Sequence, residues 1–124
     1  MLKHIVRVIH AVVREKITKV LSRSSGWPTV RKNHLKRHSF CEACGSTKIL
    51  QVHHKIPFHD NPALELNEYN LMTLCMSKKE CHIHIGHGDS YRYYNPNAVK
   101  DAARCLANPG DFDKIAKEAE ANRK

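Results

Sequence analysis

The chain has 124 residues, of which 41% are hydrophobic and 6% aromatic, so it can bury one modest core and indicates a single domain. Its formal charge of +9 arises within residues 1–40, where ten Lys and Arg stand against Glu15 alone, while eleven residues of each sign cancel from residue 41 onward. No apolar run is long enough to cross a membrane. The basic segment indicates a nucleic acid or another anionic surface as partner, or else a solvated face that only aids solubility.

Residues 2–21 carry apolar side chains at spacings of three and four residues, which is typical of an amphipathic helix with its basic side chains on the other face. We predict that this helix, within an N-terminal unit at residues 1–25, packs on the core by its apolar stripe. A helix lying on a membrane surface is the alternative. Charged residues interrupt the apolar run and no small-residue cleavage site follows it, which favours a cytoplasmic protein over a secreted one.

Past residue 26 the pattern changes to shorter elements. Pro28 suits the first turn of a helix, and Asn97 and Asp111 are candidate N-caps for two later helices. A long polar loop separates two short apolar runs that are consistent with strands, and its length makes it a candidate functional loop. The predicted elements are a helix at 29–36, strands at 49–52 and 71–74, and helices at 98–106 and 112–121.

Four of the five cysteines form two pairs, Cys41 with Cys44 and Cys75 with Cys81. Two residues between the first two thiolates let both reach one ion, and Gly45 permits the tight turn that this requires. A lone pair of this kind could be a redox centre, but four thiolates satisfy the tetrahedral preference of zinc. The cysteines therefore predict a closed, structural Zn²⁺ site, whose chelation should unfold the chain.

Five of the ten histidines also fall into two groups. His53 and His54 follow directly on the first predicted strand, and His82, His84 and His87 follow the second cysteine pair. If the cysteine pairs share one ion, they close the intervening chain at its base and bring the two groups together. Neutral imidazole can bind a divalent metal or take a proton from water. Neighbours on a strand point to opposite sides, so His53 and His54 can differ in role; a second zinc site or plain surface histidines are the alternatives.

These motifs resemble the HNH endonuclease family, especially its small phage and prophage members, over residues 27–97: CEACG, LQVHHKIPF, LELNEYNLMTLC and ECHIHIGH. The resemblance implies an α+β fold in which a ββα-metal (HNH, or His-Me finger) core is stapled by the four-cysteine zinc site and flanked by N-terminal and C-terminal helices. The nuclease domain would span residues 26–97, followed by a helical extension at 98–124. The implied activity is metal-dependent hydrolysis of DNA phosphodiester bonds to 5′-phosphate and 3′-hydroxyl ends.

Carried over to this chain, the resemblance implies that His54 is the general base. His53 and His82 would hold a catalytic metal, which could be Mg²⁺, Mn²⁺, Ni²⁺ or Zn²⁺. His87 is the expected third ligand, with His84 as a competing candidate, because neither stands four residues beyond His82. The choice between these two stays open at the level of sequence.

The resemblance further implies that Asn70 is the middle residue of the motif and forms hydrogen bonds that fix the loop and orient His54. DNA would be bound through its phosphates, and the candidate contacts are Arg31, Lys32, Lys36, Arg37 and Arg92. Analogy with small phage relatives implies a packaging or restriction-like role beside a phage terminase, in a bacterium or a phage-infected host. The sequence does not distinguish a monomer from a homodimer.

The rival hypothesis is a zinc-ribbon module that binds nucleic acid without chemistry. Both hypotheses predict zinc and a basic surface, and they differ over His54, which a binding module has no reason to place beside a second metal.

Overall fold

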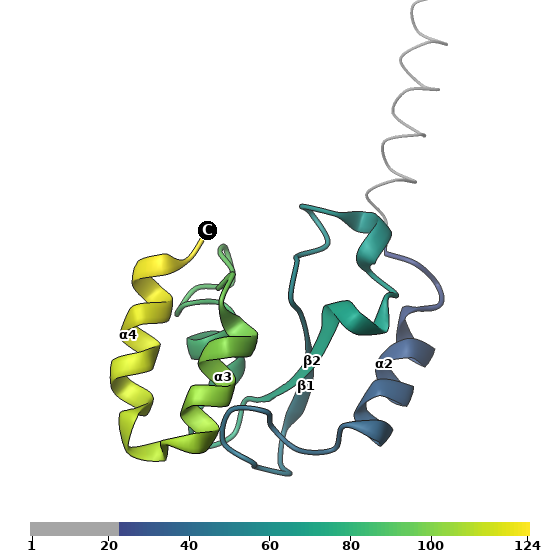
Figure 1. The fold of residues 1–124 in the computed structure, drawn as a ribbon. Coiled ribbons are helices and arrows are strands. Elements are labelled where there is room, and N and C mark those ends of the chain that lie inside the picture. Colours follow the sequence, from purple (N-terminus) through teal and green to yellow (C-terminus); the bar gives the residue numbers. More distant parts are fainter. Residues whose placement is uncertain (1–22) are drawn as a thin grey trace, which may run out of the picture.

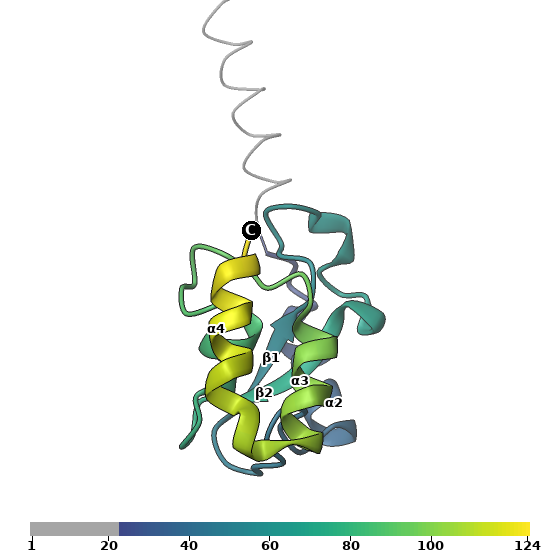
Figure 2. The same cartoon turned by 60° about the vertical axis from the view of Figure 1, so that its left-hand side comes forward.

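The computed structural model describes residues 23–124, and the helix predicted for residues 2–21 lies outside this range with most of the unit assigned to 1–25. A two-stranded antiparallel sheet lies between helix α2 (Trp27–Arg37) on one side and helices α3 (Ala98–Ala107) and α4 (Phe112–Asn122) on the other (Figure 1). Figure 2 shows α3 and α4 side by side in front of the sheet. The α+β class with flanking helices is therefore confirmed. In the described range, no helix combines the length and apolar character needed to span a bilayer.

The sheet consists of strand β1 (Leu50–His54) and strand β2 (Leu71–Cys75). They pair in a register that sets His53 opposite Met72 and His54 opposite Leu71. Strand β1 was predicted to end at residue 52, but it continues for two residues because both histidines find partners on β2. This places the histidine pair inside the sheet rather than in the loop that follows.

The helices begin and end within two residues of the predicted positions. Pro28 lies in the first turn of α2, where its missing N–H costs nothing because the first N–H groups of a helix have no intrahelical partner. Asn97 and Asp111 occupy the predicted N-cap positions of α3 and α4, but neither side chain forms a capping hydrogen bond with its helix. A capping residue needs extended backbone, whereas Asn97 has φ −103° and ψ 21° and Asp111 has φ −95° and ψ 7°.

Short turns complete the fold and carry much of its chemistry. The loop between the strands contains two 3₁₀ turns, η1 (Pro62–Leu64) and η2 (Glu68–Asn70). The helix expected after the second strand is a single turn of π-helix, η3 (His82–Gly86), which contacts the sheet and both C-terminal helices. These elements enclose a core that includes Met72, Leu74, Ile85, Ala102, Cys105 and Ile115. The η3 turn is therefore held on its inner side by packed apolar residues.

Candidate active site and metal centres

Four thiols from distant parts of the chain converge at one end of the sheet. The sulfur atoms of Cys41, Cys44, Cys75 and Cys81 all lie within 4.8 Å of one another, and none forms a disulfide. Gly45, with φ 76°, closes the turn that brings the first pair together, and its N–H donates to the Cys41 carbonyl at 2.8 Å. This confirms the predicted four-cysteine cluster, and the donor set suits a soft or borderline cation such as Zn²⁺.

The five residues between Cys75 and Cys81 form a compact turn. The N–H of Glu80 donates to the Ser77 carbonyl at 3.1 Å, and Glu80 itself has φ 48°. This turn brings the second pair of thiols together despite their long spacing. A hydrogen bond between Cys81 and Cys41 lowers the pKa of Cys41, which favours the thiolate, the form of cysteine that metals bind.

Three histidines form a second cluster, with one ring nitrogen of each of His53, His82 and His87 within 4.8 Å of the others. The Nδ1 of His82 lies 2.7 Å from Gln51 Oε1, and the Nδ1 of His87 lies 2.7 Å from the Tyr93 carbonyl oxygen. Because an oxygen of this kind can only accept, both Nδ1 atoms carry protons. Both Nε2 atoms are therefore lone-pair donors, and they face each other at 3.2 Å.

His53 completes this cluster from the sheet. Its ring is 1% exposed, and neither ring nitrogen has a hydrogen-bond partner. Burial lowers the pKa of His53 well below its ordinary value, and burial and the neighbouring His87 lower that of His82 to about 4. A cation placed between three neutral imidazoles would stabilise their converging lone pairs. The chemistry of these three residues therefore suits a bound divalent metal.

The π-helical turn explains why the ligands are five residues apart. Its wider i→i+5 hydrogen bonding brings His82 and His87 to the same side. His84 points elsewhere, with Nδ1 at 3.1 Å from Asp89 Oδ1, and it lines a different surface hollow. Gly86 is also needed here, because a Cβ at this position would lie 3.0 Å from His53 Nδ1. The structure thus brings His87, and not His84, to the cluster.

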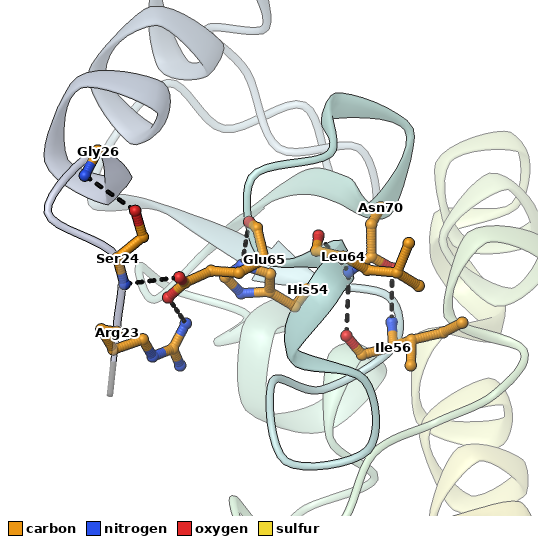
Figure 3. Close-up of polar contacts among 8 residues, drawn as sticks. All are labelled: Arg23, Ser24, Gly26, His54, Ile56, Leu64, Glu65 and Asn70. Atoms are coloured by element: carbon orange, nitrogen blue, oxygen red, sulfur yellow. Dashed lines mark hydrogen bonds and ion pairs between the residues drawn. The ribbon is translucent and has the colours of Figure 1, made fainter. Parts of the chain in front are cut away.

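His54 lies beside this cluster but is held by a different part of the chain. Its Nε2 donates to the Glu65 carbonyl oxygen at 3.0 Å, which leaves Nδ1 as the nitrogen with a free lone pair (Figure 3). The Trp27 ring packs on it with centroids 4.5 Å apart. Burial lowers the pKa of His54, so the imidazole is neutral and able to accept a proton at neutral pH.

Asn70 fixes the loop that carries Glu65, and its side-chain hydrogen bonds go to Ile56 and Leu64 rather than to His54. Its Oδ1 accepts from the Ile56 N–H at 2.9 Å, and its Nδ2 donates to the carbonyl oxygens of Ile56 at 3.0 Å and Leu64 at 3.3 Å (Figure 3). These bonds join the two ends of the loop. Asn70 therefore fixes the loop on both sides of the segment that holds His54.

The buried carboxylate of Glu65 was missed by the sequence analysis. It is 4% exposed and accepts from Arg23 Nη1 at 3.1 Å and from the Ser24 N–H at 2.8 Å. Figure 3 shows this group joining the segment before α2 to the residue that holds His54. An acidic residue in a polar loop gives no signal in the sequence that distinguishes it from a solvated one.

The histidines line a cavity of about 440 Å³, which Trp27, Arg31 and Tyr91 also border. Of the residues predicted to contact DNA, Arg31 thus reaches the cavity. Lys32 and Lys36 are exposed on α2, and Arg92 is exposed beyond η3. Arg37 is engaged with Glu68 Oε1 at 2.7 Å.

Comparison with known proteins yields one match. A family described as HNH endonuclease matches residues 41–88, a range that contains the four clustered cysteines, Asn70 and the five histidines that line the cavity. No curated protein and no solved structure matches the chain. The segment that holds both ligand clusters is therefore similar to the HNH endonuclease family.

Proposed function

We propose that the protein is a metal-dependent endonuclease that hydrolyses DNA phosphodiester bonds, with His54 as the general base. The observation that carries the proposal is the arrangement around one cavity of a neutral His54, whose Nδ1 is free, and three histidines whose ring nitrogens converge. A binding module without chemistry gives no reason for this arrangement. A phage packaging or restriction-like role beside a terminase is proposed by analogy with small phage family members alone.

In the proposed reaction, His54 Nδ1 takes the proton of a water molecule that attacks the scissile phosphorus. A P–O bond to water forms and the bond to the 3′ oxygen breaks; the departing 3′ oxygen takes a proton from solvent, which leaves a 5′-phosphate and a 3′-hydroxyl. His53, His82 and His87 would hold a divalent cation, which supplies charge neutralisation at the phosphate and the departing oxygen. The hydrogen bond from His54 Nε2 to the Glu65 carbonyl sets the tautomer and stabilises the imidazolium that forms.

The test is a plasmid-cutting assay in which the purified protein is supplied in turn with Mg²⁺, Mn²⁺, Ni²⁺ or Zn²⁺. We expect supercoiled plasmid to become nicked or linear with at least one of these ions, and the new ends to be substrates for ligase because they carry 5′-phosphates. The variant His82→Gln/His87→Gln, which lacks two of the three proposed metal ligands, is the control and should not cut the plasmid. Binding of DNA without cutting under every ion would support the zinc-ribbon alternative instead.

Lys32 and Lys36 are exposed on the helix that also brings Arg31 to the cavity, so we propose that they contact DNA phosphates. The double variant Lys32→Gln/Lys36→Gln should bind DNA more weakly. Its plot of log affinity against log salt concentration should become shallower by about two units, since each lost contact removes about 0.9. Lys114→Gln/Lys117→Gln, on exposed positions of α4, is the charge-matched control. An identical salt slope in both double variants would remove α2 from the interface.

Glu65→Gln should lower kcat by about tenfold, as expected when the partner of a catalytic histidine is displaced. The substitution removes the charge that binds Arg23 Nη1 and thereby loosens the residue whose carbonyl holds His54. Because Glu65 does not line the cavity, KM for DNA should stay unchanged. Asp60→Asn, at an exposed acid in the same loop, is the control. Equal changes in kcat and KM, or none, would contradict a positioning role.

A further inference from the structure

A third group of potential ligands lies away from the cavity. His34 lies on α2 and His38 directly follows the last residue of that helix, with ring centroids separated by 4.6 Å, and Glu68 approaches them from η2. One ligand atom of each residue lies within 4.8 Å of the other two. None of the three lines the cavity, and His34 and His38 precede the segment that matches the family.

His34 is the unusual member of this group. It is 3% exposed, yet neither of its ring nitrogens has a hydrogen-bond partner. A neutral imidazole has one N–H and one lone pair, and a buried polar group without a partner is rare in native proteins because it loses water without compensation. His38 and Glu68 are about half exposed, so an ion could reach His34 from solvent on their side.

A cation bound at this group would compete with Arg37 for the carboxylate of Glu68. Glu68 Oε1 lies 2.7 Å from Arg37 Nη2 and 3.9 Å from His38 Nε2. The carboxylate is thus already held beside the two imidazoles, and Arg37 is the group that an ion would displace. Two imidazoles and one carboxylate are a donor set that suits zinc and leaves a position for water.

We infer that His34, His38 and Glu68 form a third zinc site, distinct from the cysteine cluster and from the cavity, which fastens α2 to η2. The two elements it joins both serve the cavity. Helix α2 carries Trp27, which packs on His54, and η2 ends at Asn70, which pins the loop holding His54. An ion here would therefore stabilise the relative position of these two supports.

The experiment counts zinc bound per chain after saturation with Zn²⁺ and removal of free metal. His38→Gln should lose one equivalent relative to the wild type, and its half-exposed position makes misfolding an unconvincing cause. His82→Gln/His87→Gln should lose a different equivalent, and the triple variant should lose both. His59→Gln, an exposed histidine outside all three ligand groups, should keep the wild-type count.

Replacing Arg37, which competes with the ion for Glu68, provides a second test, in which zinc binding should increase rather than decrease. Arg37→Gln frees Glu68 from its ion pair and removes a positive charge beside the site, so zinc should bind the third site several-fold more tightly. The inference is overturned if His38→Gln keeps the full zinc count or if Arg37→Gln leaves zinc affinity unchanged. Neither result bears on the cavity, whose own ligands are tested by the loss of zinc from His82→Gln/His87→Gln.

Discussion

Replacing His54 with alanine is expected to slow DNA cleavage by about 100- to 10,000-fold, the range that general base catalysis contributes. The imidazole is the group beside the ligand cluster whose free nitrogen we propose as the proton acceptor. Its removal breaks one hydrogen bond, to the Glu65 carbonyl, and one ring contact, with Trp27. Neither contact belongs to the buried core, so the variant should unfold at nearly the wild-type temperature and retain zinc in the cysteine cluster.

The measurement is single-turnover nicking of supercoiled plasmid with protein in excess, which reports chemistry rather than product release. His84→Ala is the control, because it removes a histidine of the π-helical turn η3 that does not line the cavity. It should cut at the wild-type rate. Free imidazole should partly restore cutting by His54→Ala and leave His84→Ala unaffected. Equal rates in the wild type and His54→Ala would remove this residue from the mechanism.

Replacing Cys44 with serine is expected to abolish cooperative folding. Binding of structural zinc to small domains releases about 10–16 kcal/mol at neutral pH, which exceeds the whole stability of a typical domain. Cys44 is the exposed member of its cluster, so its sulfur contributes little to packing. A large effect at this position would therefore come from loss of a metal ligand, and a chelator should unfold the wild-type protein in the same way.

Cys105→Ala provides the comparison for this prediction, because Cys105 is buried in the core and lies outside the ligand cluster. Its loss should cost about 1 kcal/mol, as expected for a small change in packed volume. Thermal unfolding followed by circular dichroism, together with a zinc count, distinguishes the two variants. A Cys44→Ser protein that unfolds cooperatively and still binds its full zinc would show that the cysteine cluster does not hold the fold together.

The sequence predicted those parts of the structure that depend on local signals. Both strands and all three described helices were found within two residues, because proline, glycine and apolar spacing mark their ends. The four cysteines could also be grouped from their pairing alone. The N-cap positions were also found, but the expected capping hydrogen bonds are absent, because capping requires extended backbone and the chain enters α4 directly from a 3₁₀ turn at residues 109–111.

The finer features of the site depend on contacts between distant segments. The choice between His84 and His87 required the π-helical turn, whose spacing is set by packing against the sheet and the C-terminal helices. The role of Glu65 depends on Arg23, which is 42 residues away in the chain. Such pairings leave no periodic pattern, so no spacing rule applied to one sequence could have found them.

The close approach of Gly86 to His53 makes the geometry of the histidine cluster depend on a residue that donates nothing to an ion. A methyl group there would lie 3.0 Å from His53 Nδ1 and 3.1 Å from Leu74 Cδ1, tighter than ordinary side chains pack, so the ring would have to move by a few tenths of an ångström. Alanine at residue 86 thus keeps every donor atom while altering its placement. A form of the protein that binds DNA but does not cut it could therefore be sought by the single substitution Gly86→Ala, with all the histidines kept.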